Sequence, residues 1–183
     1  MKIESTDIDG AFLLKPTIHT DGRGFFHEGW NARLFHEIGI DVDFFQDNFS
    51  RSKSGVLRGM HYQMAPAQGK LVAVTRGKIF DVAVDLRRSS KTFSKVVSIE
   101  LDDAARTMLW IPPGCAHGFY VMSPDGADIM YKCSEQYAPE SERTIAWNDS
   151  ELSIAWPVPL GEQPILSGKD QQGVCFANAE LFE

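Results

Sequence analysis

The sequence of 183 residues has few cysteines, and their spacing suits neither a disulfide framework nor a metal site. Cys115, Cys133 and Cys175 are odd in number and form no C-x-x-C pair, whereas disulfide scaffolds and cysteine zinc sites depend on paired spacing. We therefore expect free thiols in a reducing cytosol.

The sequence also lacks an apolar run of the roughly 20 residues that a membrane span needs. It begins MKIESTDIDG, with acidic side chains where a signal peptide has an apolar stretch. Basic charge is in deficit too, since 18 Lys and Arg face 25 Asp and Glu, a formal net charge of −7. That field repels polyanions, so we expect a soluble cytoplasmic protein with no nucleic acid or membrane partner. An anionic ligand would need local basic residues.

Internal repeats, low-complexity tracts and linker-like segments are absent, which predicts a single domain over residues 1–183. One helix is expected from Asn31 to Ile38, because Asn31 is a typical helix start and Gly39 a typical stop. Segment 78–86 alternates, which predicts a strand with one packed face. Its two sides are Phe80, Val82, Val84 and Leu86, and Ile79, Asp81, Ala83 and Asp85.

Further short strand-like runs are separated by Gly, Pro, Asp or Ser. They cover residues 69–75, 95–101, 106–112, 117–122 and 128–133. Many short strands with one helix predict an all-β sandwich or barrel, of which the jelly roll closes most sheet edges. A site in such a fold lies inside the barrel or at its mouth.

Polar side chains concentrate in GVLRGMHYQ (55–63) and QGKLV (68–72), which contain Arg58, His61 and Lys70. On a regular strand Arg58 and His61 would face opposite sides, so a shared site requires a bulge or kink at Gly59. Exposed positions on an edge strand explain these residues equally well. Tyr131 and Tyr137 could supply an acid and a stacking ring, but on their own they are more typical of buried packing with a polar tip. Lys169 and Asp170, on their own, are typical of a solvated turn.

His61 and His117 do not complete a metal site. Metal-binding cupins usually present H-x-H followed by a glutamate, but here Gln63 replaces the second histidine and the next residues read MAPAQGK. Two imidazoles without a third strong ligand bind zinc or iron poorly. His117 by itself, after a Pro-Pro-Gly turn, is more typical of a hydrogen-bonded structural histidine.

Taken together, these segments resemble the dTDP-4-dehydrorhamnose 3,5-epimerase family over about residues 8–172. The similarity rests on order and spacing of DGRGFFHE, QDNFSRSKSGVLRGMHYQ, QGKLV, FDVAVDLR, WIPPGCAHGF, YKCSEQYAPESE and LSGKD. It implies a cupin jelly-roll barrel, a homodimer, no cofactor and a nucleotide-sugar substrate. One departure is Cys115, which stands where the family commonly has Phe, and this implies a pocket without one large apolar wall.

The resemblance also implies individual roles. His61 looks like the base that removes a proton, Asp170 like its orienting partner, Tyr131 like the acid on the other face of the sugar, and Lys70 like the cation at the enolate oxygen. Tyr137 corresponds to the residue that stacks on the nucleotide base. The other substrate-contact positions are Arg23, Glu28, Gln46, Asp47, Asn48, Arg58, His117, Glu142 and Lys169.

These roles suit inversion next to a ketone. The C4 carbonyl acidifies the hydrogens on both C3 and C5, and inversion needs a base and an acid on opposite faces. The expected reaction converts dTDP-4-dehydro-6-deoxy-D-glucose to dTDP-4-dehydro-L-rhamnose through an enolate. Inversion at C3 alone, a GDP-linked or heptose substrate, and a noncatalytic sugar-binding cupin stay open as alternatives.

Overall fold

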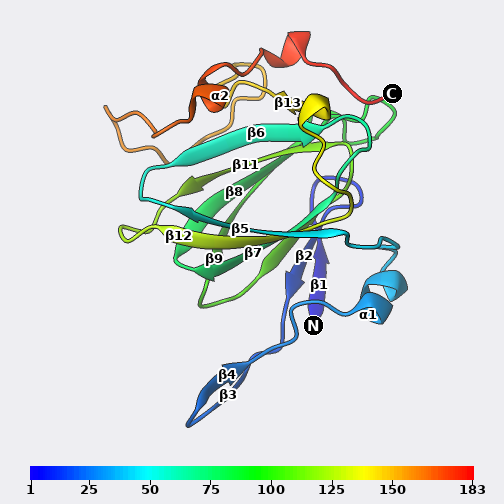
Figure 1. Cartoon of the computed structure of the whole chain (residues 1–183), viewed down its shortest axis with the longest axis vertical. Helices are drawn as coiled ribbons and strands as arrows, with labels where there is room; N and C mark the ends of the chain where they lie inside the picture. Colours follow the sequence, from blue (N-terminus) through cyan, green and yellow to red (C-terminus); the bar gives the residue numbers. More distant parts are fainter.

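The computed structural model describes residues 1–183 as two facing β-sheets, a projecting hairpin and short helices (Figure 1). The strands are β1 (Lys2–Ser5), β2 (Phe12–Lys15), β3 (His19–Asp21), β4 (Gly24–Phe26), β5 (Gln46–Ser52), β6 (Leu57–Gln63), β7 (Lys70–Arg76), β8 (Lys78–Asp85), β9 (Val96–Asp102), β10 (Met108–Ile111), β11 (Cys115–Val121), β12 (Ala127–Cys133) and β13 (Glu142–Thr144). The helices are α1 (Ala32–Glu37), α2 (Gly168–Gln171) and the 3₁₀ turns Pro139–Ser141 and Phe176–Asn178.

One sheet has the order β1-β2-β10-β7-β12-β5 and the other the order β13-β6-β11-β8-β9. All neighbouring strands are antiparallel, and most neighbours in space are distant in sequence. This is the connectivity of a jelly roll, so the predicted all-β cupin barrel is confirmed. Strand β5 lies at the free edge of its sheet, and the β3–β4 hairpin projects away from the barrel (Figure 1).

The main apolar core lies between the sheets, where Val72, Ile79 and Phe119 are almost fully buried. A second core covers the outer face of the five-stranded sheet, where Val82 and Val84 pack with Ile145 and Phe176 from the C-terminal segment. The prediction of one packed face for 78–86 is therefore wrong. Side chains alternate as expected, but the chain after β13 covers the second face.

The expected helix is confirmed as α1, which packs on the outer face of the six-stranded sheet through Phe35. The Asn31 side chain accepts a hydrogen bond from the Leu34 amide, which caps the first turn. Gly39 follows the helix with a φ of +83°, a conformation that glycine adopts without strain. The longest helix, α1, has six residues, whereas a helix that crosses a membrane needs about 20.

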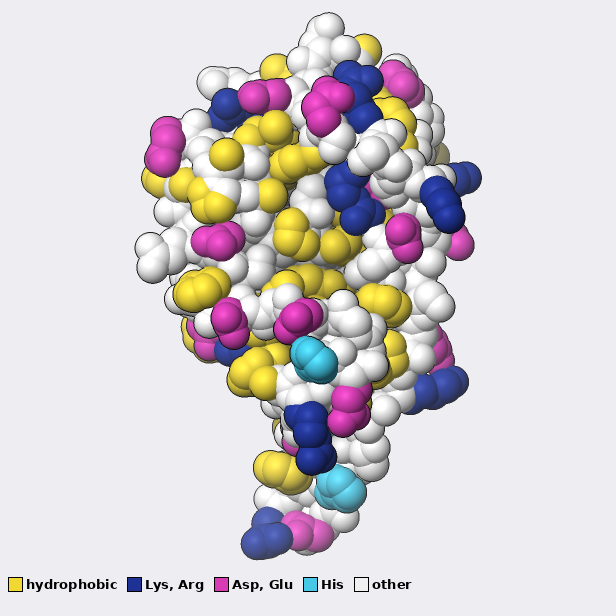
Figure 2. Space-filling model, turned by 90° about the vertical axis from the view of Figure 1, so that its right-hand side faces the viewer, with side chains coloured by type: hydrophobic (Ala, Val, Ile, Leu, Met, Phe, Trp, Pro, Cys, Tyr) yellow, Lys and Arg dark blue, Asp and Glu magenta, His cyan; other side chains and the backbone are white.

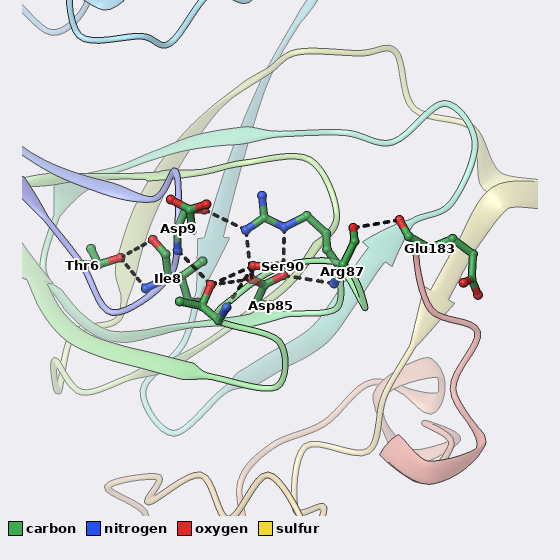
Figure 3. Close-up of polar contacts among 9 residues, drawn as sticks. Thr6, Ile8, Asp9, Asp85, Arg87, Ser90 and Glu183 are labelled. Atoms are coloured by element: carbon green, nitrogen blue, oxygen red, sulfur yellow. Dashed lines mark hydrogen bonds and ion pairs between the residues drawn. The ribbon is translucent and has the colours of Figure 1, made fainter.

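A buried carboxylate organises the end of the barrel where β8 finishes (Figure 3). Asp85 accepts hydrogen bonds from the Arg87 side chain and from the hydroxyls of Ser90 and Thr92, at 2.6 to 2.9 Å. Arg87 also donates to the carbonyl of Asp9, which ties the N-terminal loop to this corner. Burial alone would raise the pKa of Asp85, but these donors outweigh it and hold the pKa at about 2.

Candidate active site

A cavity of about 280 Å³ opens between the two sheets. It receives side chains from both, so residues far apart in sequence meet there. Its lining consists of Asn48, Ser50, Arg58, His61, Gln68, Lys70, His117, Phe119, Tyr131, Cys133, Tyr137, Glu142 and Lys169.

Arg58 and His61 both line this cavity because β6 is irregular between them. His61 pairs with His117 of β11 and Arg58 with Phe119, so three steps on β6 oppose two on β11. Gly59 at the bulge has a φ of +134°, and a Cβ there would lie 2.5 Å from the Gly118 Cα. The predicted requirement for a kink at Gly59 is confirmed.

His61 and Asp170 form a hydrogen-bonded pair, with 2.7 Å between Nε2 and Oδ1. Asp170 is almost fully buried in α2 and also accepts from the Gly59 amide and from Ser167. Burial alone would raise the pKa of Asp170, but these donors hold it well below its usual range. Since the ionised carboxylate only accepts, Nε2 carries the hydrogen and Nδ1 is left as the basic nitrogen.

The pKa of His61 is lowered, because burial disfavours the charged imidazolium more strongly than Asp170 supports it. The imidazole is consequently neutral near pH 7 and able to accept a proton. Lys70, at the start of β7, shares the cavity, and burial likewise lowers the pKa of its amine. No hydrogen bond or ion pair within the protein engages this amine, so it is free for a ligand oxygen.

Tyr131 lies in β12, in the sheet opposite the one that carries His61. Its hydroxyl is 3.1 Å from the Ser50 Oγ, and its ring meets the His117 ring edge to face at 6.2 Å between centroids. Burial raises the pKa of the Tyr131 phenol above its usual range, so the phenol keeps its proton at neutral pH. A neutral base and a protonated phenol thus face one cavity from its two walls.

The mouth of the cavity is lined by Tyr137, Glu142 and Lys169. Glu142 accepts a 2.7 Å hydrogen bond from the Tyr137 hydroxyl and forms an ion pair with Lys169. The Tyr137 amide donates to Gln46, whose own side chain donates to Asn48. Tyr137 is half exposed, which leaves its ring accessible to a planar ligand.

Four residues singled out in the sequence lie elsewhere. Asp47 faces outward from β5, and its carboxylate binds the Lys132 amine at 2.8 Å. Arg23 and Glu28 belong to the projecting hairpin and the segment after it, and Arg23 pairs with Asp21 at 2.6 Å. Cys115 is packed in the core between the sheets and does not line the cavity, so the expected loss of a pocket wall at this position is wrong.

His117 has a carboxylate partner of its own, since its Nε2 lies 2.7 Å from Asp81 Oδ1. Asp81 is fully buried and its second oxygen has no partner in the chain. No group of three or more His, Cys, Asp or Glu side chains is arranged to hold a metal ion. The polar groups of the cavity therefore suit proton transfer and anion binding better than metal coordination.

Several cavity residues were not predicted from the sequence. Ser50, Gln68, Phe119 and Cys133 line the cavity, and Asp81 lies behind it. One signal was available for Ser50: polar residues recur at every second position of 46–52, the period of one strand face. The others depend on which strands pair, which local sequence does not reveal.

Known proteins resemble this chain along almost its whole length. The sequence profile of the dTDP-4-dehydrorhamnose 3,5-epimerase family matches residues 5–178, nearly the whole chain. The chain belongs to the dTDP-4-dehydrorhamnose 3,5-epimerase family. This confirms the resemblance inferred from the sequence motifs, and it makes the protein an epimerase, that is, an isomerase.

Relatives within this epimerase family are close over their full length. The dTDP-4-dehydrorhamnose 3,5-epimerase of Pseudomonas aeruginosa is 51% identical over 183 residues, covering 100% of this chain and 99% of that protein. A Legionella pneumophila dTDP-6-deoxy-D-glucose-3,5-epimerase, solved with dTDP-4-keto-L-rhamnose, superposes with a TM-score of 0.94 at 46% identity, covering 100% and 97% of the two chains.

A more distant member is ChmJ, a 3′-monoepimerase from Streptomyces bikiniensis solved with dTDP-quinovose. It superposes with a TM-score of 0.85 at 35% identity, covering 93% of this chain and 85% of that one. The epimerase family thus contains members named for one inverted carbon as well as members named for two.

Proposed function

We propose that this epimerase inverts C3 and C5 of dTDP-4-dehydro-6-deoxy-D-glucose and yields dTDP-4-dehydro-L-rhamnose. The observation that carries the proposal is the pairing of a neutral, carboxylate-bound His61 with a protonated Tyr131 across one cavity. Inversion requires removal of a proton from one face of a carbon and delivery to the other, and two opposed groups meet that requirement.

In this mechanism His61 Nδ1 takes the proton from C5 or C3, and the electron pair moves into an enolate with its charge on the C4 oxygen. The Lys70 side chain, whose nitrogen has no partner within the protein, donates a hydrogen bond to that oxygen. A preorganised donor in a secluded site contributes about 3 to 4 kcal/mol. Tyr131 then gives its proton to the carbon from the other face. Asp170 keeps the His61 ring in position and supports its charged form.

Substrate binding uses the remaining cavity residues. Arg58 and Lys169 are suited to the diphosphate, because guanidinium and ammonium groups form charge-assisted hydrogen bonds to phosphate oxygens. They provide the local positive charge that an acidic protein needs for an anionic ligand. Tyr137 offers a ring for the nucleotide base, while Asn48, His117 and Glu142 offer hydrogen bonds to the sugar. Gln46 accepts a hydrogen bond from the Tyr137 amide. The predicted substrate contact of Asp47 has no place in this cavity, because its side chain faces outward to Lys132.

We further propose that the functional unit is a cytoplasmic homodimer. The β3–β4 hairpin, residues 19–26, forms an arm that extends away from its own barrel (Figure 2). Arg23 lies on this arm and Glu28 next to it, and the family resemblance assigns both to the substrate. Phe26 on the arm and Phe49 on the free edge strand β5 are 70% and 74% exposed, a costly arrangement unless another surface covers them. A second copy would cover such surfaces and bring Arg23 to a substrate.

The alternative is inversion at C3 alone, the activity for which the similar but more distant 3′-monoepimerase is named. Incubation of the protein with dTDP-4-dehydro-6-deoxy-D-glucose in deuterated water separates the possibilities by NMR. Deuterium and inversion at both C3 and C5 are expected. Deuterium at C3 alone would favour the alternative, and no exchange at either carbon would overturn the proposed function.

A further inference from the structure

The inward face of β5 carries polar side chains at every second position, and each is hydrogen-bonded to a residue that lines the cavity. The bonds are Gln46 with the Tyr137 amide, Asn48 with the Cys133 thiol, Ser50 with the Tyr131 hydroxyl and Ser52 with the Arg58 guanidinium.

Strand register explains the pair formed by Ser50 and Tyr131. Tyr131 lies directly opposite Asn48, and Ser50 lies opposite Ile129, so the two hydroxyls meet along the diagonal. Diagonal neighbours on one sheet face are within reach of long side chains such as tyrosine. Ser50 Oγ is the only hydrogen-bond partner of the Tyr131 hydroxyl, at 3.1 Å, and either hydroxyl can donate.

No other polar side chain forms a hydrogen bond with the Tyr131 hydroxyl. The Arg58 guanidinium donates to Ser52 Oγ and to the Arg51 carbonyl. His117 touches Tyr131 with its ring, and its Nε2 is bound to Asp81. Rotation of the Tyr131 hydroxyl is therefore restrained by Ser50 alone.

A phenol that gives up its proton becomes a phenolate, which is costly in a site that raises its pKa by burial. A hydroxyl that already lies against the phenol oxygen can donate to the phenolate as soon as it forms. Such a donor needs no reorganisation during the reaction, which is the condition under which hydrogen bonds accelerate a chemical step.

We propose that Ser50 is a positioning residue of the epimerisation: it holds the Tyr131 hydroxyl toward the substrate and donates a hydrogen bond to the phenolate left by proton delivery. This role deepens the proposed function and rests on it. Ser50 acts on the second half of the reaction, after His61 has already removed a proton from the substrate.

The test compares two rates on dTDP-4-dehydro-6-deoxy-D-glucose in deuterated water at saturating substrate. Proton removal is followed by NMR as washout, the replacement of the hydrogens on C3 and C5 by deuterium. Inversion is followed as the formation of product. In Ser50→Ala we expect washout within about 3-fold of the wild type and inversion lowered about 10- to 100-fold, the range covered by a hydrogen bond to a charged group. Ser50→Thr, which keeps the hydroxyl, should restore most of the inversion.

Ser98→Ala is the matched control, because it removes an exposed hydroxyl from β9 of the other sheet and should alter neither rate. An equal loss of washout and inversion in Ser50→Ala would overturn this role and indicate a purely structural one. Should the alanine variant unfold, Ser50→Thr and Ser50→Val carry the same comparison, since they differ only in the hydroxyl. A wild type without washout would instead overturn the proposed function itself.

Discussion

At the scale of single residues, one wall of the cavity carries a group that is ready to accept a proton, and the opposite wall carries a group that is ready to donate one. Burial lowers the pKa of His61 and raises that of Tyr131, so one environment prepares both a base and an acid. The difference between them lies in the residue type, because burial disfavours the charged form of each. Asp170 supplies the orientation that burial alone does not.

Substitutions at His61 and Tyr131 should therefore fail in different ways. His61→Ala removes the base, so both deuterium washout and inversion should nearly vanish. Tyr131→Phe leaves the base in place, so the enolate still forms and collapses back on the His61 face. Washout should persist while inversion falls by about 100-fold or more, the usual contribution of a positioned acid. Deuterium uptake and product coupling constants, both read by NMR, measure the two rates; equal losses in Tyr131→Phe would refute this division.

Tyr137 is predicted to act in binding and not in chemistry. Tyr137→Ala should raise KM by the equivalent of about 1 to 3 kcal/mol, the contribution of base stacking, with little change in kcat. Tyr137→Phe keeps the ring and loses only the bond to Glu142, so it should stay close to the wild type. Steady-state kinetics measure both constants, and a large fall in kcat at unchanged KM would mean that the residue takes part in the reaction.

At the scale of elements, local sequence signals predicted much of the secondary structure. The helix start at Asn31 and the alternation of 78–86 depend on near neighbours, and both features are present in the structure. The second packed face of β8 was not predictable, because the segment that covers it begins about 60 residues later. Likewise Ser50 meets Tyr131, and Asp81 meets His117, through strand registers that only the folded barrel defines.

The Asp85 cluster is an element-scale feature that should contribute to stability. Asp85→Asn removes the charge at the centre of four side-chain donors, so the free energy of unfolding at pH 7 should fall by about 2 to 3 kcal/mol. Denaturant unfolding measures the loss. Asp125→Asn, in an exposed turn, is the control and should change stability by less than about 0.5 kcal/mol.

The same cluster gives a pH dependence with a defined sign. The pKa of Asp85 is about 2 in the fold and about 4 in an unfolded chain, so its stabilisation is complete above pH 4. As the pH falls toward 2 the stabilisation is lost, and the difference between wild type and Asp85→Asn should shrink with it. A difference that stays constant from pH 7 to about pH 2.5 would show that the Asp85 charge is not its source.

At the scale of the whole molecule, the projecting arm predicts that sites are shared between chains. If Arg23 serves the partner's cavity, a mixed dimer of Arg23→Ala and His61→Ala chains contains one cavity with both residues intact. Mixed dimers isolated with two affinity tags should recover about half of the wild-type kcat/KM, although each parent dimer is strongly impaired.

The controls for this experiment are the two parent dimers measured alone. Activity of the mixed dimer no higher than their mean would place Arg23 in its own chain's site or outside any site. Light scattering of the wild type at micromolar concentration should give the mass of a dimer, and a monomeric mass would refute the shared arrangement. The substrate contacts assigned to Arg23 and Glu28 stay predictions.

The bulge at Gly59 has a consequence for how this protein tolerates change over evolution. A methyl group at residue 59 would meet the Gly118 backbone at 2.5 Å, and one at residue 118 would meet Met60 Sδ at 2.6 Å and the Arg58 carbonyl at 2.9 Å. Neither glycine has a side chain with which to touch a substrate. Selection for the reaction should nevertheless preserve both as strictly as His61, because the missing carbon atoms allow two functional side chains of one strand to face the same way.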